Sequence, residues 1–430
     1  MNQFLIRLAD VRREAVTFLV LTLLLVCVRG ARAGDVSAMD FSRIDAFALA
    51  APPEATQSVA SLAAYLKNGC TNDLEITRAI FRWMADNIAY DTPTFLAGAF
   101  GSTNPDTVLR SRKSMCAGYA CLFVALGRAA GLEVQRVTGY GKGLTYSEYD
   151  KINGFNHDWN AVKLNGEWRL LDVTWGAGHI TPEHTFARSF EPFYFLTPPD
   201  QFVLNHLPAN PHWQLLDPPL SKEAFAQQVF FWPAYFRCGL KLHSPLTGVV
   251  QVADRLAVEM DAPRDSLVTA SVEQGNTRFD QCPLFCERTT DGFKVEVAFP
   301  APGQYEVCIY AKKKADPGMC ESALRYKVTA TAAFPGRRPF PVQYGEFVDR
   351  GVTLTSPRQG VLQAGGTVDF ALSVPDAEEV GVIIAGRLTR LTRRGDRFEG
   401  KAAITGSKVS LCARFPGGQD YSVLLEYEAD

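Results

Sequence analysis

Residues 114–131 read SMCAGYACLFVALGRAAG, the pattern of a single helix with a cysteine in its first turn. Ser114 is the predicted N-cap, and Gly131 stands where a glycine commonly ends a helix. The helix N-terminus supplies partial positive charge and unpaired N–H groups that lower the pKa of a thiol, so Cys116 is placed to react as a thiolate. The alternative is that Cys116 is a small buried apolar residue, as most free cysteines are.

Two downstream runs supply partners for this thiol. NHDWNAVKL (156–164) and EWRLLDVTW (167–175) alternate in polarity and are separated by Asn165 and Gly166, which favours a β-hairpin with a two-residue type I′ turn. Positions that sum to 331 then face each other, so the expected pairs are Lys163 with Trp168, Ala161 with Leu170, Trp159 with Asp172, and His157 with Thr174.

In that register His157 and Asp172 are diagonal neighbours on one face of the sheet, within reach of a hydrogen bond between imidazole and carboxylate. A base that takes the thiol proton and an acid that holds the base are what a Cys-His-Asp triad needs. Asp158 follows His157 directly and points to the opposite face, so it is the weaker candidate.

Several stretches carry a resemblance to known proteins. They are FRWMADNIAYD (81–91), CAGYA (116–120), GYGKG (139–143), HDWN (157–160), GEWRLLDVTWGAG (166–178), FYFLTP (193–198), HLP (206–208) and WQLL (213–216). With them the chain resembles the transglutaminase-like superfamily, and within it the branch of the kyphoscoliosis peptidase, over residues 60–240.

The resemblance implies an α+β papain-like (transglutaminase-like) domain. It implies Cys116 as nucleophile, His157 as general base and Asp172 as the residue that orients the base. Two positions depart from the branch, which often has Gln where this chain has Ala117 and Ala where it has Asp158.

The N-terminus has the pattern of a secretory signal. Three arginines precede an apolar run at residues 15–28, and Ala31 and Ala33 follow it. The run is short for a membrane span and has the length of a signal h-region. We expect a signal peptide over residues 1–33 and a secreted or periplasmic protein, with membrane attachment only through an uncleaved signal segment.

Export would make the cysteines candidates for disulfides. The chain has ten cysteines, and setting aside Cys27 in the signal and Cys116 as nucleophile leaves eight, enough for up to four bridges. Sequence alone does not define the pairing. Outside the first domain, the pairs closest in sequence are Cys282 with Cys286 and Cys308 with Cys320.

A second helix is predicted over residues 74–88, where apolar residues recur at helical spacing, and we expect it to pack under the Cys116 helix. Trp83 and Tyr90 either face the cleft or belong to the core, the commoner role of aromatic residues at such spacing. GYGKG (139–143) lacks the strand-then-helix context of a phosphate-binding loop, so we interpret it as the end of a strand beside His157.

After residue 211 the chain changes to short alternating runs with regularly spaced turn residues, which is typical of β-sandwiches. An internal repeat supports this interpretation. LHSP (242–245) with GVVQ (248–251) recurs at an offset of 112 as LTSP (354–357) with GVLQ (360–363). Cys308 and Cys412, in VCI and LCA, are predicted to occupy equivalent strands.

The predicted organisation follows from these patterns. A signal peptide (1–33) and a loose lead-in (34–58) precede the transglutaminase-like domain (59–230). Two all-β immunoglobulin-like sandwiches (231–331 and 342–430) follow, joined by a proline-rich linker (332–341).

Metal, cofactor and nucleic-acid sites have little support. The spacing of His179 and His184 matches no common zinc motif. His206, His212 and His243 lie in proline-rich connections and are predicted as surface or turn residues. The net charge is −2 and no basic stripe with interleaved aromatics occurs, so we predict no cofactor, no metal and no nucleic-acid partner.

Two functions remain after these exclusions. In the first, the protein is an exported thiol enzyme of peptidase or transglutaminase type that acts on peptide or glutamine amide bonds through a thioester. In the second, it is a catalytically inactive scaffold that binds a cell-wall or matrix protein. In either case the sandwiches position the first domain or bind a protein partner, because fold alone assigns no function.

Overall fold

The computed structural model describes residues 36, 39–143, 154–275, 277–278 and 284–430. The predicted signal peptide, with Cys27, and also Cys282 lie outside these residues. Within the described part, none of the helices has the length and hydropathy needed to cross a membrane.

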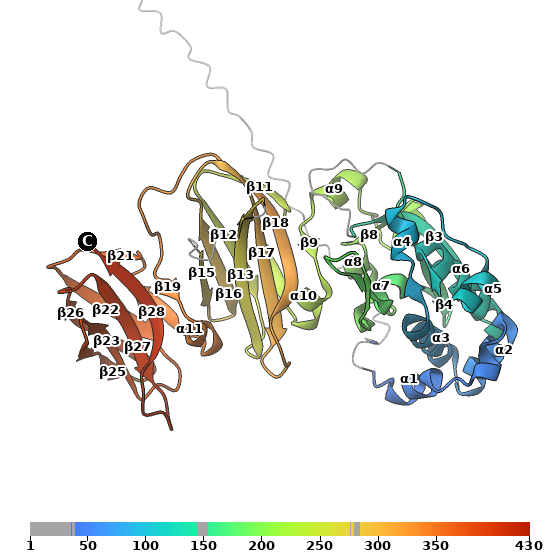
Figure 1. Cartoon of the computed structure of the whole chain (residues 1–430), viewed down its shortest axis with the longest axis horizontal. Helices are drawn as coiled ribbons and strands as arrows, with labels where there is room; N and C mark the ends of the chain where they lie inside the picture. Colours follow the sequence, from blue (N-terminus) through green and yellow to red (C-terminus); the bar gives the residue numbers. More distant parts are fainter. Residues whose placement is uncertain (1–35, 37–38, 144–153, 276, 279–283) are drawn as a thin grey trace, which may run out of the picture. The chain divides into compact units, whose positions relative to one another are not determined.

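The first domain combines helices with a four-stranded antiparallel sheet of order β5-β4-β3-β8 (Figure 1), which confirms the predicted α+β class. Its helices are α1 (Ser42–Leu49), α2 (Val59–Asn68), α3 (Asp73–Asn87), α4 (Thr92–Leu96), α5 (Pro105–Ser111), α6 (Cys116–Ala130), α7 (Val173–Ala177) and α8 (Pro199–Phe202). Its strands are β1 (Ala89–Tyr90), β2 (Lys113–Ser114), β3 (Val134–Gly141), β4 (His157–Leu164), β5 (Glu167–Leu171), β6 (Gly178–Ile180), β7 (Phe186–Arg188) and β8 (His206–Pro208).

The cysteine helix α6 lies between the sheet and the other helices. It packs against β3 and β4 on one side and against α2, α3 and α5 on the other. Its N-cap is Met115, so the predicted cap is wrong by one residue, because Ser114 belongs to β2 and its hydroxyl donates to the carbonyl of Ser102 at 3.1 Å. The predicted C-terminus is confirmed, since Gly131 ends the helix with φ of 95°.

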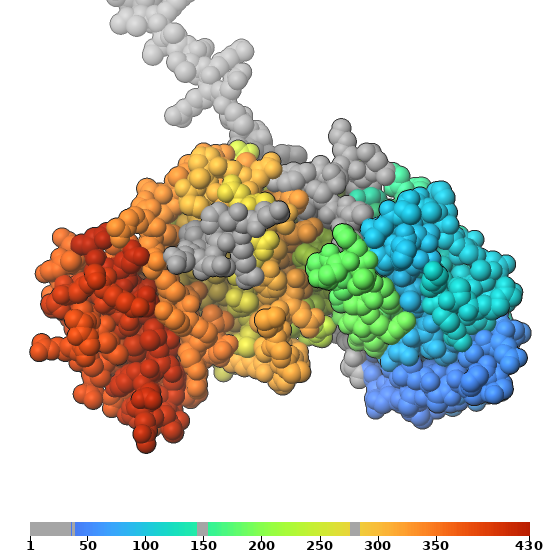
Figure 2. Space-filling view, viewed as in Figure 1, coloured from blue at the N-terminus to red at the C-terminus, as the bar shows by residue number. Residues whose placement is uncertain are grey.

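Helix α3 confirms the prediction for residues 74–88 and packs against α6. Helix α1 packs against α3, with Ile44 and Ala48 buried. Residues 42–49 are therefore part of the fold, and the prediction of a loose lead-in is wrong for them, because two apolar side chains one helical turn apart give this segment a face to bury. Figure 2 shows the blue and cyan residues of these helices as one closely packed surface.

The hairpin between β4 and β5 has the predicted register. Ala161 pairs with Leu170, and Lys163 pairs with Trp168. At the turn, Asn165 has φ of 52° and Gly166 has φ of 84°, the left-handed values that a type I′ turn requires. The two outermost predicted pairs do not form, because β5 ends at Leu171 and the chain turns into α7.

Two β-sandwiches follow, as predicted (Figure 1). The first pairs a sheet of order β10-β12-β16-β15 with one of order β11-β18-β17-β13-β14, and β9 adds to β18. Its elements, with the connecting helices, are α9 (Lys222–Gln227), β9 (Phe230–Phe231), α10 (Pro233–Arg237), β10 (Lys241–Ser244), β11 (Val249–Val252), β12 (Arg255–Asp261), β13 (Ser266–Gln274), β14 (Thr277–Arg278), β15 (Leu284–Arg288), β16 (Gly292–Ala298), β17 (Gly303–Lys313) and β18 (Glu321–Ala330).

The second sandwich repeats this plan with sheets of order β20-β22-β26-β25 and β19-β28-β27-β23-β24, and β21 adds to β28. Its elements are β19 (Val342–Gln343), α11 (Gly345–Asp349), β20 (Thr353–Ser356), β21 (Val361–Leu362), β22 (Thr367–Ser373), β23 (Glu379–Ile384), β24 (Arg387–Arg390), β25 (Thr392–Arg394), β26 (Arg397–Ala403), β27 (Lys408–Arg414) and β28 (Ser422–Ala429).

The internal repeat is confirmed in the strands. β10 and β12 lie 112 positions before β20 and β22. Cys308 and Cys412 lie on equivalent strands, because β17 is paired with β13 and β18 just as β27 is paired with β23 and β28. One hydrogen bond also recurs, since the hydroxyls of Tyr326 and Tyr427 donate to the carbonyls of Pro245 and Pro357 at 3.0 and 3.1 Å.

The eight cysteines in the described part of the chain are all free thiols. The considered bridge between Cys308 and Cys320 is absent, because the residue opposite Cys308 on β18 is Arg325. Cys286 is buried and its thiol donates to the carbonyl of Val268 at 3.1 Å. In the other pair named from the sequence, Cys282 with Cys286, Cys282 lies outside the described residues.

Candidate active site

Cys116 is the first residue of α6 and is 8% exposed. The chain enters the helix from β2, which pairs in parallel with β1 and sets Ser114 beside Tyr90. Gly118 allows this close packing, since a Cβ there would lie 1.9 Å from the Ser114 hydroxyl and 2.5 Å from the Ser102 carbonyl. The thiol thus lies in the first turn of a long helix, where backbone N–H groups are unpaired.

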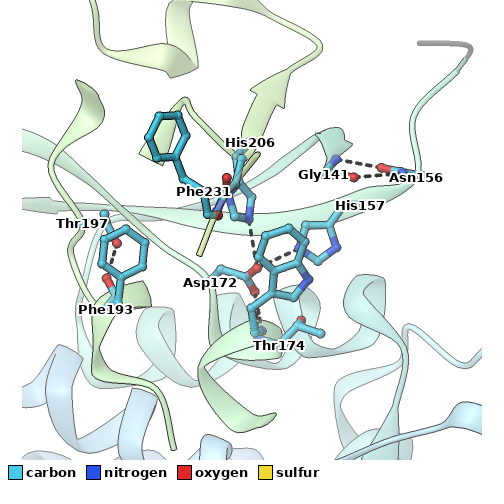
Figure 3. A network of polar contacts seen from close by, with 11 residues as sticks. Gly141, Asn156, His157, Asp172, Thr174, Phe193, Thr197, His206 and Phe231 are labelled. Atoms are coloured by element: carbon cyan, nitrogen blue, oxygen red, sulfur yellow. Dashed lines mark hydrogen bonds and ion pairs between the residues drawn. The ribbon is translucent and has the colours of Figure 1, made fainter. Parts of the chain in front are cut away.

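His157 begins β4, and its ring is held from several sides. Trp175 stacks on it with ring centroids 4.9 Å apart and an interplanar angle of 25°. Gly141 on the neighbouring strand leaves room for the ring, since a Cβ there would lie 3.1 Å from it. Asn156 binds both backbone groups of Gly141, accepting from its N–H at 2.8 Å and donating to its carbonyl at 3.1 Å (Figure 3). These contacts fix the start of β4.

Asp172 is the N-cap of α7 and is fully buried. Its Oδ1 accepts hydrogen bonds from the backbone N–H of Thr174 at 2.8 Å and of Trp175 at 3.2 Å. Its Oδ2 lies 2.7 Å from Nε2 of His157 and 3.1 Å from Nε2 of His206 (Figure 3). Four donors therefore hold one buried carboxylate.

The titration of these groups follows from their burial and their charges. Burial alone would lower the pKa of His157, but the charge of Asp172 and hydrogen bonds to Asp172 and Cys116 outweigh it and raise the pKa to about 10. Burial would raise the pKa of Asp172, yet its interactions with His157 and His206 hold that pKa well below its usual range. The ring of His157 is thus a cation between a carboxylate and the thiol, with Nε2 engaged by Asp172 and Nδ1 left for Cys116.

Asp158 takes no part in this network. Its carboxylate forms an ion pair with Arg136, with Nε to Oδ1 at 2.8 Å, and accepts from the Thr138 hydroxyl at 2.6 Å. The predicted assignment of Asp158 to the opposite face of β4 is therefore confirmed.

His206 was mispredicted. It was expected at the surface or in a turn, but it lies in β8, is 1% exposed and contacts Asp172. Strand β8 pairs with the end of β3 at the edge of the sheet, and the rings of Phe202, Trp175 and Trp159 lie against the imidazole and cover it. The sequence analysis contained one signal for this position, the HLP stretch of the resemblance, but it assigned His206 no role in the site. Asn156 and Trp175 were also not named as candidates.

The two aromatic candidates, Trp83 and Tyr90, differ in their surroundings. Trp83 is 1% exposed with the guanidinium of Arg112 over its ring, so it belongs to the core. Tyr90 is half-buried, and burial, with the charges of Cys116 and Asp172, raises its pKa, so it lies near the site.

The remaining histidines, His179, His184, His212 and His243, are exposed. In the described part of the chain, the one cluster with the composition of a metal site is that of His157, Asp172 and His206, whose ligand atoms lie within 4.8 Å of one another. The short imidazole–carboxylate contacts already give each of these three side chains a hydrogen-bond partner.

Comparison with known proteins agrees with this fold. Residues 60–173 match the transglutaminase-like superfamily, and residues 222–341 match the KY-like, immunoglobulin-like domain. The chain carries a transglutaminase-like domain followed by a KY-like immunoglobulin-like domain.

Two curated proteins are similar to this chain over much of its length. The kyphoscoliosis peptidase of Mus musculus is 30% identical over 74% of this chain and 48% of its own length, and that of Homo sapiens is 33% identical over 66% and 42%. The chain thus spans somewhat less than half the length of these relatives. A solved structure described as a TGase is 16% identical, covers 37% of this chain and 38% of its own, and has a TM-score of 0.22.

Proposed function

We propose that this protein is an exported thiol acyl-transfer enzyme, of peptidase or transglutaminase type, with Cys116, His157 and Asp172 as its catalytic triad. The observation that carries the proposal is the buried 2.7 Å contact between Nε2 of His157 and Oδ2 of Asp172. Cys116 begins helix α6, which packs against β4, and its thiol is among the groups that raise the pKa of His157. A transglutaminase-like domain and relatives named peptidases support the same class of chemistry.

In the first step the thiolate of Cys116 bonds to the carbonyl carbon of an amide. The carbon–nitrogen bond breaks, and the leaving amine or ammonia takes its proton from the imidazolium of His157. Asp172 keeps the ring charged and oriented until that transfer. The backbone N–H of Cys116, unpaired at the helix start, stabilises the negative oxygen that forms.

In the second step water or a primary amine attacks the thioester carbon. The attacking molecule gives its proton to His157, the carbon–sulfur bond breaks, and Cys116 leaves as thiolate. Hydrolysis and transamidation use the same three residues, and the difference is whether an amine reaches the thioester before water.

The substrate class is a peptide or a glutamine amide in a protein, and the sandwiches are proposed to bind a protein partner. Export belongs to the same proposal and rests on the charged and apolar pattern of residues 1–33. A secreted or periplasmic location is expected.

The first test is the pH dependence of Cys116 alkylation by iodoacetamide, measured by mass spectrometry between pH 5 and 9. We expect labelling to persist well below the free-thiol pKa of about 8.5 and to be lost in His157→Ala and Asp172→Ala. His179→Ala, which changes an exposed histidine, is the matched control. Buried thiols act as internal references, because burial raises the pKa of Cys286 to about 12 and of Cys412 to about 11.

The second test measures turnover of protein substrate. Release of new amino termini from casein and incorporation of a fluorescent primary amine into its glutamines are followed together, with Cys116→Ala as the blank. If Cys116 titrates as an ordinary thiol, or both activities equal the blank, the enzyme proposal is wrong and the inactive scaffold replaces it.

A further inference from the structure

Asp172 Oδ2 is shared by two histidines. His157 comes from β4 and His206 from β8, and β3 lies between these strands in the sheet. The two Nε2 atoms approach the same oxygen at 2.7 and 3.1 Å, as Figure 3 shows. A Cys-His-Asp triad needs only the first of these contacts, so the second calls for its own explanation.

The direction of the second hydrogen bond follows from the charges. Burial lowers the pKa of His206 to about 4 despite its bond to Asp172, so the ring is neutral near pH 7. The pKa of Asp172 is held well below its usual range, so the carboxylate has no proton to donate. The proton therefore resides on Nε2 of His206, which donates to Asp172.

The ring of His206 is fixed by aromatic neighbours. Phe202 stacks on it with centroids 4.0 Å apart and an interplanar angle of 21°. Trp175 and Trp159 lie 4.4 and 5.0 Å away by the same measure. Since Trp175 also stacks on His157, the two imidazoles are packed into one aromatic enclosure. A ring held this way presents its N–H in a single direction.

We infer that His206 is a positioning residue, whose Nε2–H holds Oδ2 of Asp172 against His157. The inference rests on the proposed function. Thr174 and Trp175 hold only Oδ1, so without His206 the far oxygen is held by His157 alone and the carboxylate can turn about its anchored end. A turned carboxylate pairs less well with the imidazolium, and less thiolate forms at low pH.

The test compares two substitutions that differ in the donor. His206→Phe keeps a ring for stacking and removes the N–H, whereas His206→Gln keeps an amide N–H. The pH profile of Cys116 alkylation is the readout. For His206→Phe we expect the acid limb, the pH range in which labelling falls as the pH is lowered, to move up by about one pH unit. At a pH on this limb, labelling then falls about tenfold, and His206→Gln should recover most of this loss.

A matched control separates positioning from loss of packing. Val137→Ala removes buried methyl groups from the apolar cluster that contains Phe202 and leaves every donor in place. It is expected to lower the melting temperature without moving the acid limb. The inference is overturned if His206→Phe leaves the limb unchanged or moves it to lower pH, or if Val137→Ala moves it equally.

Failure of the proposed function would be seen separately, in the unsubstituted protein. If its Cys116 has no acid limb below that of a free thiol, the triad is wrong. The downfield NMR signal of the His157 Nε2 proton then decides the role of His206. Faster solvent exchange of this proton in His206→Phe supports positioning, and unchanged exchange overturns it.

Discussion

Asp158 and Arg136 form a two-bond ion pair on the face of β4 opposite to His157. Arg136 Nε lies 2.8 Å from Oδ1 and Nη2 lies 3.0 Å from Oδ2. Neighbouring residues of a strand point to opposite faces, so the charge next to the proposed base in sequence is separated from it in space. This explains how an acidic residue is accommodated directly beside the proposed base.

Asp158→Asn is expected to reduce stability without changing the thiol. The substitution weakens the ion pair with Arg136 and the bond from Thr138 and should cost about 1 kcal/mol in the free energy of unfolding of the first domain, measured in urea. The acid limb of Cys116 alkylation should stay where it is in the wild type. A shift as large as that of Asp172→Ala would place Asp158 in the catalytic network instead.

The raised pKa of His157 predicts a pH-dependent stability. A group whose pKa rises on folding stabilises the fold below its unfolded pKa, about 6.5, and this stabilisation is lost as the pH rises through the folded value of about 10. The wild type should therefore exceed His157→Gln in free energy of unfolding most strongly below pH 6.5. The difference should shrink by at least about 1 kcal/mol between pH 6.5 and 10.

Urea titrations at several pH values measure this difference, and His179→Gln, at an exposed position on β6, is the matched control. The difference in free energy of unfolding between the wild type and a variant contains no contribution from groups that titrate identically in both proteins. A difference that stays constant over this range would contradict the strong pairing of His157 with Asp172.

The sequence predicted those parts of the site that depend on local geometry. The Asn165-Gly166 turn fixes the hairpin register, and that register brings His157 toward Asp172. The prediction failed where the strand ended: Asp172 caps α7, so its contact with His157 is made from a helix start and not from a diagonal position in the ladder.

Long-range pairing was not accessible from the pattern of residues. His206 lies 34 positions from Asp172, and the polarity pattern of its proline-containing surroundings does not indicate a buried edge strand. The cap of α6 was wrong for a similar reason, because Ser114 is drawn into β2 by its pairing with Tyr90. Tertiary contacts decided both positions against the local preference.

Gly166→Ala tests the turn. With φ of 84° and no atom within 4 Å of an added Cβ, any loss of stability comes from backbone conformation and not from a clash. We expect a loss of about 1 kcal/mol, measured by urea unfolding of the first domain. Gly345→Ala, in α11 with ordinary φ and room for a Cβ, should be neutral or slightly stabilising for the second sandwich, to which α11 belongs, when the unfolding of that sandwich is measured in the same way. Equal losses at both positions would rule out a turn-specific effect.

Asp45→Asn tests whether α1 is an integral part of the first domain. Its carboxylate holds the guanidinium of Arg78 through two bonds of 2.7 Å, and Arg78 is 5% exposed. Three phenylalanine rings, those of Phe41, Phe190 and Phe195, surround the guanidinium, with centroids 4.8 to 5.1 Å from it. These rings stabilise a cation but accept no strong hydrogen bond, so losing the carboxylate leaves a buried charge poorly paired.

We therefore expect Asp45→Asn to cost about 3 kcal/mol in the free energy of unfolding of this domain. Glu133→Gln is the control, because it breaks an ion pair with Lys163 whose side chains are 57% and 36% exposed, and it should cost less than about 1 kcal/mol. Urea unfolding of both variants under identical conditions gives the comparison. Similar small losses would mean that α1 detaches readily, and residues 42–49 would then behave as the loose lead-in that their composition suggested.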